Sequence, residues 1–371
     1  MTTQPTTSTP HDDGSRGRAR DTAGVARITP AGRGRGAVRA LVVALATALV
    51  ASCAACSVRL ESAPYPEPSP GPVEQVRART LGDALALEAD ARAALATRPG
   101  AAVADVLDDV VAFSADHASQ LGPAYDSGLT PSATATSSAP TRTTPSDVLT
   151  ELAATTRDAL ADADGVADAD LARLVASIAA ARDQLTRRLA TATEAKVPDL
   201  DVVVTPSPAP SVTGSPAPEP TPSPEQTDAA QATSADDLAP LVVAHDQAGF
   251  AYEVIAAQQS GSLRTAARAA AAQHRDEAQR WAVAAGVAET AQDPRRASYT
   301  LPDGLDKGST ARRLARALEG AVADAAATLV ARTPAGQRSP FVDALRTANA
   351  AARTWGAAPV PFPGMPERAD G

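Results

Sequence analysis

Four amphipathic segments in the last third of the sequence restrict the fold more than any other feature. Apolar residues recur at helical intervals in about 238–259, 263–285, 309–329 and 340–355. About three residues separate the first two segments, so we expect them to form antiparallel neighbouring helices. The last two segments are joined by a short turn around Pro334, which predicts a second helical hairpin.

The connection between the two hairpins indicates how the helices are ordered. Val287 to Gly308 is a stretch of 22 residues that contains Pro294 and Pro302. Extended, such a stretch reaches roughly 70 Å, and a helix over 263–285 is only about 33 Å long. The connection can therefore run the whole length of a bundle. A hairpin, a long crossover and a second hairpin predict an all-α, ferritin-like four-helix bundle.

Local signals mark the ends of these helices. Ser234 and Asp237 have the spacing of a capping box at the start of the first helix. Gly286 follows the second helix and suits the left-handed conformation of a helix end. Ser339 and Pro340 predict that the fourth helix begins with a hydroxyl cap and a proline at the first helical position.

A second helical unit is expected over residues 73–196. The chain is 44% hydrophobic but only 3% aromatic, a balance that favours slender helical bundles over thick mixed cores. A Ser/Thr/Pro-rich connection over 122–145 divides this unit into two pairs, so it repeats the plan of the last third. We interpret it as a degenerate second bundle; a looser coiled-coil-like stalk is the alternative. The candidate helices are 73–97, 101–121, 146–163 and 167–195.

The first 52 residues have the pattern of a lipoprotein signal peptide with a long basic leader. The 13 residues from Ala40 to Ser52 are apolar, a length typical of a signal-peptide core and too short to span a bilayer. Cys53 follows a run that resembles a lipobox, so we expect it to carry the lipid anchor. Cys56 is a poorer second site, and an ordinary secretory signal is the alternative. Residues 53–72 then form the anchor and a proline-rich tether.

Charge and cysteine content narrow the classes of partner. The net charge is −9, and the first 52 residues carry seven arginines against three aspartates, 7 − 3 = +4, which leaves −9 − 4 = −13 for the rest. An acidic body argues against nucleic acid as a partner, so the membrane would be contacted through acyl chains on the extracytoplasmic face. Because the chain has two cysteines, Cys53 and Cys56, thiolate chemistry in the body is excluded.

Two further segments lack the composition to build a core. Residues 197–236 are an expected disordered linker, with eight prolines between Thr205 and Glu225. Residues 367–371 are an expected tail, which places the last folded domain at 237–366.

The last third also resembles a known family. Over 238–366 it is similar to a ferritin-like domain family of unknown function found in lipoproteins of high-GC Gram-positive bacteria. The resemblance implies a fold and a location, and the family has no assigned reaction. The matching residues are Ala251–Glu253, His274–Arg275, Ser298–Pro302, Leu318–Glu319, Ala352–Gly356 and Phe362–Gly364.

Three polar residues on the inward stripes are candidate metal ligands. From the turn at Gly261, His245 lies 16 residues before, His274 lies 13 after and Glu277 lies 16 after. In an antiparallel hairpin these positions share nearly the same depth, so two imidazoles and a carboxylate are expected to converge. Such a set suits iron, manganese or zinc. Further candidates at the edge of this site are Glu253 and Glu319.

The same residues also fit a purely structural interpretation. Di-iron bundles of this class place a Glu on two helices and Glu-x-x-His on the other two. Here the second helix has the reverse order, His274 to Glu277, and the fourth helix has neither Glu nor His between Phe341 and Trp355. Buried histidines and glutamates in a bundle commonly satisfy each other through hydrogen bonds.

Two hypotheses about function therefore remain. The first is a non-catalytic, lipid-anchored protein of the cell envelope whose bundles bind a protein, a peptide or another envelope component. The second is a degenerate ferritin-like metalloprotein. The sequence contains no phosphate-binding loop, nucleophile elbow or His-Glu-x-x-His motif, each of which would indicate an enzyme. The oligomeric state is not indicated by the sequence.

Overall fold

A computed structural model describes residues 70–125, 143–200 and 233–368, and these ranges are entirely helical or irregular. The expected signal peptide, Cys53, nearly all of the tether and most of the linker lie outside the described residues. None of the described helices is both long and apolar enough to cross a membrane. The helices are α2 (Pro72–Leu95), α3 (Ala101–Leu121), α4 (Pro145–Gly165), α5 (Ala169–Ala192), α6 (Ala235–Gln258), α7 (Gly261–Ala284), α8 (Gly308–Arg332), α9 (Ser339–Thr354) and the short 3₁₀-helix η2 (Pro366–Arg368).

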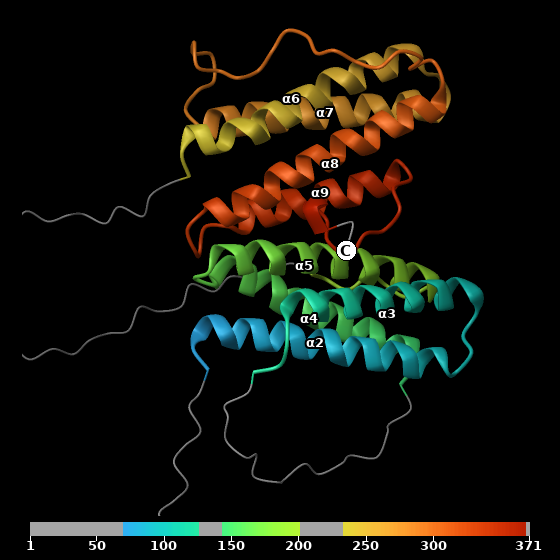
Figure 1. Ribbon diagram of the computed structural model, residues 1–371. Coiled ribbons are helices and arrows are strands. Elements are labelled where there is room, and N and C mark those ends of the chain that lie inside the picture. The colour runs from blue at the N-terminus through green and yellow to red at the C-terminus, as the bar shows by residue number, and fades with distance from the viewer. Residues whose placement is uncertain (1–69, 126–142, 201–232, 369–371) are drawn as a thin grey trace, which may run out of the picture. The chain divides into compact units, whose positions relative to one another are not determined.

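Helices α2 to α5 form the first group. α2 packs on α3 and α4 packs on α5, so the group consists of two hairpins that also contact each other (Figure 1). Asp168 begins α5 by accepting a hydrogen bond from the amide of Leu171 at 2.8 Å. The apolar stripe of α5 lies fully inside the core and includes Val175, Ile178, Leu185 and Leu189.

Helices α6 to α9 form the second group, in the connectivity that the sequence predicts. α6 pairs with α7, α8 pairs with α9, and α6 packs against α8 (Figure 1). The Ser234 hydroxyl caps α6, and Gly286 has a φ of 68° just beyond α7, as expected. The crossover is fastened to α6 at Asp246, whose carboxylate accepts hydrogen bonds from the amide of Arg296 at 2.9 Å and the hydroxyl of Tyr299 at 2.7 Å. The prediction of an all-α chain, with a C-terminal bundle built from two hairpins, is confirmed.

One side of this bundle stays open. α7 packs mainly on α6, α9 packs on α8, and α7 and α9 make few close backbone contacts with each other. Alanine is the commonest of the α7 and α9 residues that face this gap, and its side chain is too short to fill it. A groove therefore runs between these two helices, and α6 and α8 form its floor.

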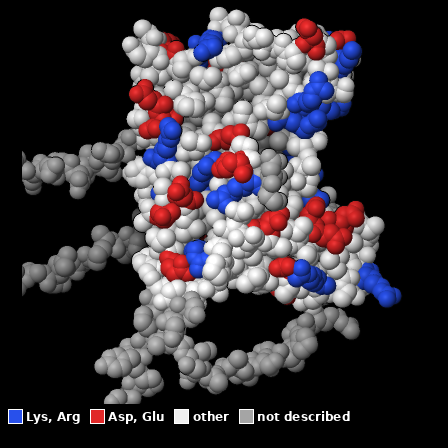
Figure 2. Space-filling view, in the orientation of Figure 1, with Lys and Arg blue, Asp and Glu red and all other residues white. Residues whose placement is uncertain are grey.

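The two helical groups share buried surface. α5 packs against α8 and α9, and a single apolar cluster contains Val175 and Ala179 of α5 together with Val322 and Leu345 from the second group. The segment after α9 also reaches the first group, because Phe362 and Met365 are buried in a cluster with Ile178. On the face drawn in Figure 2, acidic and basic side chains are interspersed over the helices.

The start of α9 differs from the sequence-based expectation. Ser339 does not cap the helix with its hydroxyl: the residue at the cap position is Arg338, and no side chain of this segment caps the helix. The Asp164 carboxylate of α4 does so instead, accepting hydrogen bonds from the amides of Arg338 at 2.6 Å and Ser339 at 2.8 Å. The prediction of a hydroxyl cap was wrong because the cap comes from another part of the chain. Pro340 is the second residue of the helix, one position later than expected, because the helix already begins at Ser339.

Candidate functional site

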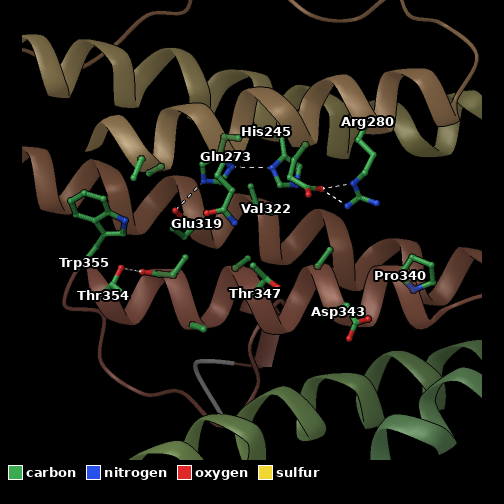
Figure 3. Close-up of a pocket in the computed structure, with 18 of the residues that line it drawn as sticks. His245, Gln273, Arg280, Glu319, Val322, Pro340, Asp343, Thr347, Thr354 and Trp355 are labelled. Atoms are coloured by element: carbon green, nitrogen blue, oxygen red, sulfur yellow. Dashed lines mark hydrogen bonds and ion pairs between the residues drawn. The ribbon is translucent and has the colours of Figure 1, made fainter. Parts of the chain in front are cut away.

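The groove between α7 and α9 is the candidate site. It encloses a cavity of about 800 Å³, within the size range of small-molecule sites. Figure 3 shows Thr347, Asp343 and Pro340 along the α9 side and Gln273 and Arg280 on α7. Small side chains form much of the two walls: Ala266, Ala269 and Ala270 on α7, and Ala344, Ala348 and Ala351 on α9.

A chain of buried polar groups lies across the floor of the groove. The Tyr252 hydroxyl donates to Glu319 Oε1 at 2.6 Å, and His274 Nε2 lies 3.1 Å from the same oxygen. His274 Nδ1 is in turn 2.9 Å from His245 Nδ1. Each of these four residues is at most 6% exposed. The dashed lines in Figure 3 follow this chain from Glu319 to His245.

Aromatic stacking holds the chain in place. The rings of Tyr252 and His274 are nearly parallel, with centroids 5.4 Å apart, and Tyr252 also stacks on Trp355 at 5.2 Å. Trp355 closes one end of the groove. Burial, with the neighbouring Glu319 carboxylate, raises the pKa of Tyr252 far above its usual value, so this hydroxyl stays protonated.

Burial also keeps His245 neutral. Loss of solvent lowers the pKa of His245 to about 3, and His274 and the Arg280 guanidinium contribute to the shift. His245 Nε2 is buried and has no hydrogen-bond partner in the part of the chain that the structure describes. The His245 ring lines the groove, and its Nε2 is a buried polar atom that the described residues leave unpaired.

Charged residues line the end of the groove that is opposite Trp355. Glu277 accepts a hydrogen bond from Arg280 Nε at 3.0 Å, and the Arg280 guanidinium lies 4.2 Å from the centre of the Trp281 ring. Asp343 lines the same end from α9. This end is charged, and the middle of the groove combines small apolar side chains with the uncharged polar side chains of Gln273 and Thr347 on its walls and the buried polar groups at its floor.

The structure brings together some of the predicted site residues and separates others. His245 and His274 are adjacent, as their nearly equal depth in the hairpin predicts. Glu319, predicted only as an edge candidate, is the carboxylate that contacts His274. Glu277 lines the groove but pairs with Arg280, and Glu253 lies outside it, half exposed and bound to Arg275.

Several groove residues were not found from the sequence. Arg280 was missed although it lies three positions after Glu277, a spacing that pairs opposite charges on a helix. The alanines of the walls could not be recognised in the sequence as groove residues, because alanine is as common in a packed interface as in an open groove.

The arrangement offers a direct test of whether the candidate ligands fit a metal ion. The two imidazoles face each other through their Nδ1 atoms, and Glu319 contacts the opposite nitrogen of the His274 ring. In this geometry the three groups do not point to one shared position. Among the described residues, no group of three or more His, Cys, Asp or Glu side chains is placed to hold a metal ion.

Comparison with known proteins supports the sequence-based resemblance. Residues 238–367 match the model of a family described as "Domain of unknown function (DUF4439)". The match begins in the first turn of α6 and ends in η2, so it contains the whole groove. Similarity of the last third to a family of unknown function is thereby confirmed. No curated protein and no solved structure shows a significant match to the chain.

Proposed function

We propose that this chain is a lipid-anchored protein of the cell envelope whose ferritin-like C-terminal domain binds a ligand in the groove between α7 and α9, without catalysis. The observation that carries the proposal is the cavity of about 800 Å³ inside the domain that matches the family. A bundle that only had to be stable would gain by closing α7 onto α9, since buried apolar area stabilises a fold by about 25 cal/mol per Å².

The make-up of the groove also favours binding. Binding sites for small molecules are mostly apolar, with a few polar groups at fixed positions. Here alanines form much of the walls, and the polar groups at the floor are held by hydrogen bonds and ring stacking. A floor that is ordered in this way needs little rearrangement to accept a ligand, which lowers the entropic cost of binding.

Native mass spectrometry tests the proposal. The protein is incubated with an extract of small molecules from the envelope of its own cells, desalted and weighed intact. We expect a bound organic adduct that Ala270→Phe removes, because Ala270 lines the groove. Ala272→Phe is the matched control, on an exposed position of the same helix outside the groove. An adduct unaffected by Ala270→Phe, or no adduct in any protein, would refute the proposal.

The lipid anchor rests on the sequence alone. The apolar run that ends at Ser52, followed by Cys53 and a proline-rich tether, supports attachment to the membrane through a palmitate-bearing cysteine. The test is labelling of cells with a palmitate analogue. Label on the wild-type chain and none on Cys53→Ala, with Cys56→Ala unchanged, is the expected result; label that persists on Cys53→Ala would contradict it.

The metalloprotein hypothesis is the second candidate, favoured by the two adjacent imidazoles beside a buried carboxylate. Rearrangement of His245 and His274 would be needed for both to bind one ion. The test is the iron, manganese and zinc content per chain, measured by elemental mass spectrometry after desalting. Near-stoichiometric metal that His274→Ala removes would establish this function in place of the first.

A further inference from the structure

In the chain of buried groups on the groove floor, the donor and the acceptor of each hydrogen bond can be assigned. The hydroxyl of Tyr252 donates to Glu319 Oε1, and the carboxylate oxygen can only accept from His274 Nε2. His274 Nε2 must therefore carry a proton. In the neutral imidazole this is the single proton of the ring, which leaves His274 Nδ1 as an acceptor.

The second imidazole continues the same direction. His245 Nδ1 lies 2.9 Å from the bare Nδ1 of His274, so it must donate to it. The single proton of His245 is then used, and His245 Nε2 is left with a free lone pair. This atom is buried, has no partner among the described residues, and belongs to a ring that lines the groove. Buried polar atoms in native proteins are almost always paired.

The charges around the groove indicate which donors suit this atom. A carboxylate ligand has no proton to donate, and it would meet Glu319, Glu277 and Asp343 in the same groove. A cationic ligand would meet the Arg280 guanidinium, which lies close enough to lower the pKa of His245. Both kinds of ion would also lose their hydration between walls of alanine.

We propose that His245 Nε2 is the recognition atom of the groove, and that the ligand is a neutral molecule that donates an O–H or N–H group to it from an apolar body. The inference rests on the proposed binding function and adds the class of ligand. Hydrogen bonds link the side chains of Tyr252, Glu319, His274 and His245 in a fixed order. The order leaves His245 Nε2 as an acceptor, so the ligand must be a donor. Trp355 and the alanine walls contact the apolar body.

The first part of the test needs no ligand. Nitrogen NMR of ¹⁵N-histidine-labelled protein at about pH 8 distinguishes the two tautomers of each ring. The His245 and His274 signals are assigned with His245→Phe and His274→Phe. We expect the Nε2–H tautomer for His274 and the Nδ1–H tautomer for His245. A His245 that carries its proton on Nε2 would overturn the inference.

The second part uses four probes of the same shape. Cyclohexanol is a neutral donor, methoxycyclohexane has no donor, cyclohexylammonium is a cation and cyclohexanecarboxylate is an anion. We expect cyclohexanol to shift the His245 Nε2 signal and to bind about tenfold more tightly than the other three, as one added hydrogen bond allows. Trp355 fluorescence in a Trp281→Phe background gives a second measure of binding, since only Trp355 of the two tryptophans lines the groove.

Variants separate recognition by His245 from a general effect of losing a histidine. His245→Phe should abolish the preference for cyclohexanol, and His117→Phe, which changes a buried histidine of the first helical group, should retain it. Equal affinity for the four probes, or an unchanged preference in His245→Phe, would overturn the inference and leave the proposed function standing. If no probe binds, the inference also fails, and the native mass spectrum decides the proposed function by itself.

Discussion

Asp164 and Arg338 complete each other's helix ends across the two helical groups. The Asp164 carboxylate accepts the backbone amide of Arg338 at 2.6 Å at the start of α9. The Arg338 guanidinium, 2% exposed, donates to the carbonyl of Val166 at 2.5 Å, just after α4, and to the carbonyl of Thr333 at 2.8 Å, just after α8. Helix ends leave backbone groups unpaired, and this pair satisfies groups at three ends at once.

Replacing Asp164 should therefore destabilise the whole fold. We expect Asp164→Ala to lower the free energy of unfolding by about 1–3 kcal/mol, because it leaves the buried amide of Arg338 and the partly buried amide of Ser339 without their acceptor. Asp158→Ala, on an exposed position of the same helix, should change it by less than about 0.5 kcal/mol. Urea unfolding measures both, and equal effects would contradict the assigned role of Asp164.

Gly364 should be irreplaceable for a different reason. Its φ is 73°, and an added Cβ would lie 2.7 Å from both the Ala323 carbonyl oxygen and the Ala327 side chain. Gly356 has a similar φ of 83°, but its nearest neighbour would be 3.9 Å away. Gly356→Ala should therefore cost about 1–2 kcal/mol for the backbone conformation alone. Gly364→Ala should cost a further ~1–3 kcal/mol for overpacking, and thermal unfolding that ranks the two variants equally would refute this.

His117 should make the fold sensitive to acid. It is fully buried, with its Nε2 2.8 Å from the Pro361 carbonyl oxygen, and burial lowers its pKa from 6.5 to about 3. Between these values the unfolded chain binds more protons than the folded chain, so stability is full above pH 6.5 and falls as the pH is lowered toward 3.

The slope of this loss approaches about 1.4 kcal/mol per pH unit for one histidine. His245, whose pKa is also lowered to about 3, adds a second contribution over the same range. Unfolding free energies at a series of pH values should show a smaller slope in His117→Phe, by about one proton. A variant with the slope of the wild type would show that His117 is not the group responsible.

Removing the hydroxyl group of Tyr252 and removing that of Tyr299 are matched changes whose effects on stability can be compared. Among the described residues, the Tyr252 hydroxyl and His274 are the hydrogen-bond partners of the buried Glu319 carboxylate. Tyr299 donates to Asp246, which also accepts from Arg275 and from the amide of Arg296. We expect Tyr252→Phe to cost about 1–3 kcal/mol and Tyr299→Phe about 0.5–1.5 kcal/mol. Chemical unfolding with the reverse order would contradict this account of the groove floor.

The helices were predictable because their signals are local. Apolar periodicity, the Ser234 cap and the Gly286 stop depend on neighbours in the sequence, and the structure agrees with them. The cap on α9 was not predictable, because Asp164 lies 174 positions from Arg338 and only the packing of the two groups brings them together.

The site was predictable within one hairpin and less so beyond it. Similar distances from the turn, 16 residues for His245 and 13 for His274, placed the two rings side by side. The choice of Glu319 over Glu277 as the partner of His274 depends on how α8 crosses α7, which helical spacing does not specify. The open side of the bundle could not be predicted for the same reason. The distance between two helices depends on how they pack, and the apolar stripe of a single helix gives no information about that distance.

A structure of the protein purified from its own cells would test the central claim most directly. The decisive observation is the density between α7 and α9 next to His245. We expect an organic molecule with a donor atom within about 3.2 Å of His245 Nε2 and its apolar body against Trp355 and the alanine walls. A metal ion bound by His245 and His274, or a groove that holds only water, would contradict it.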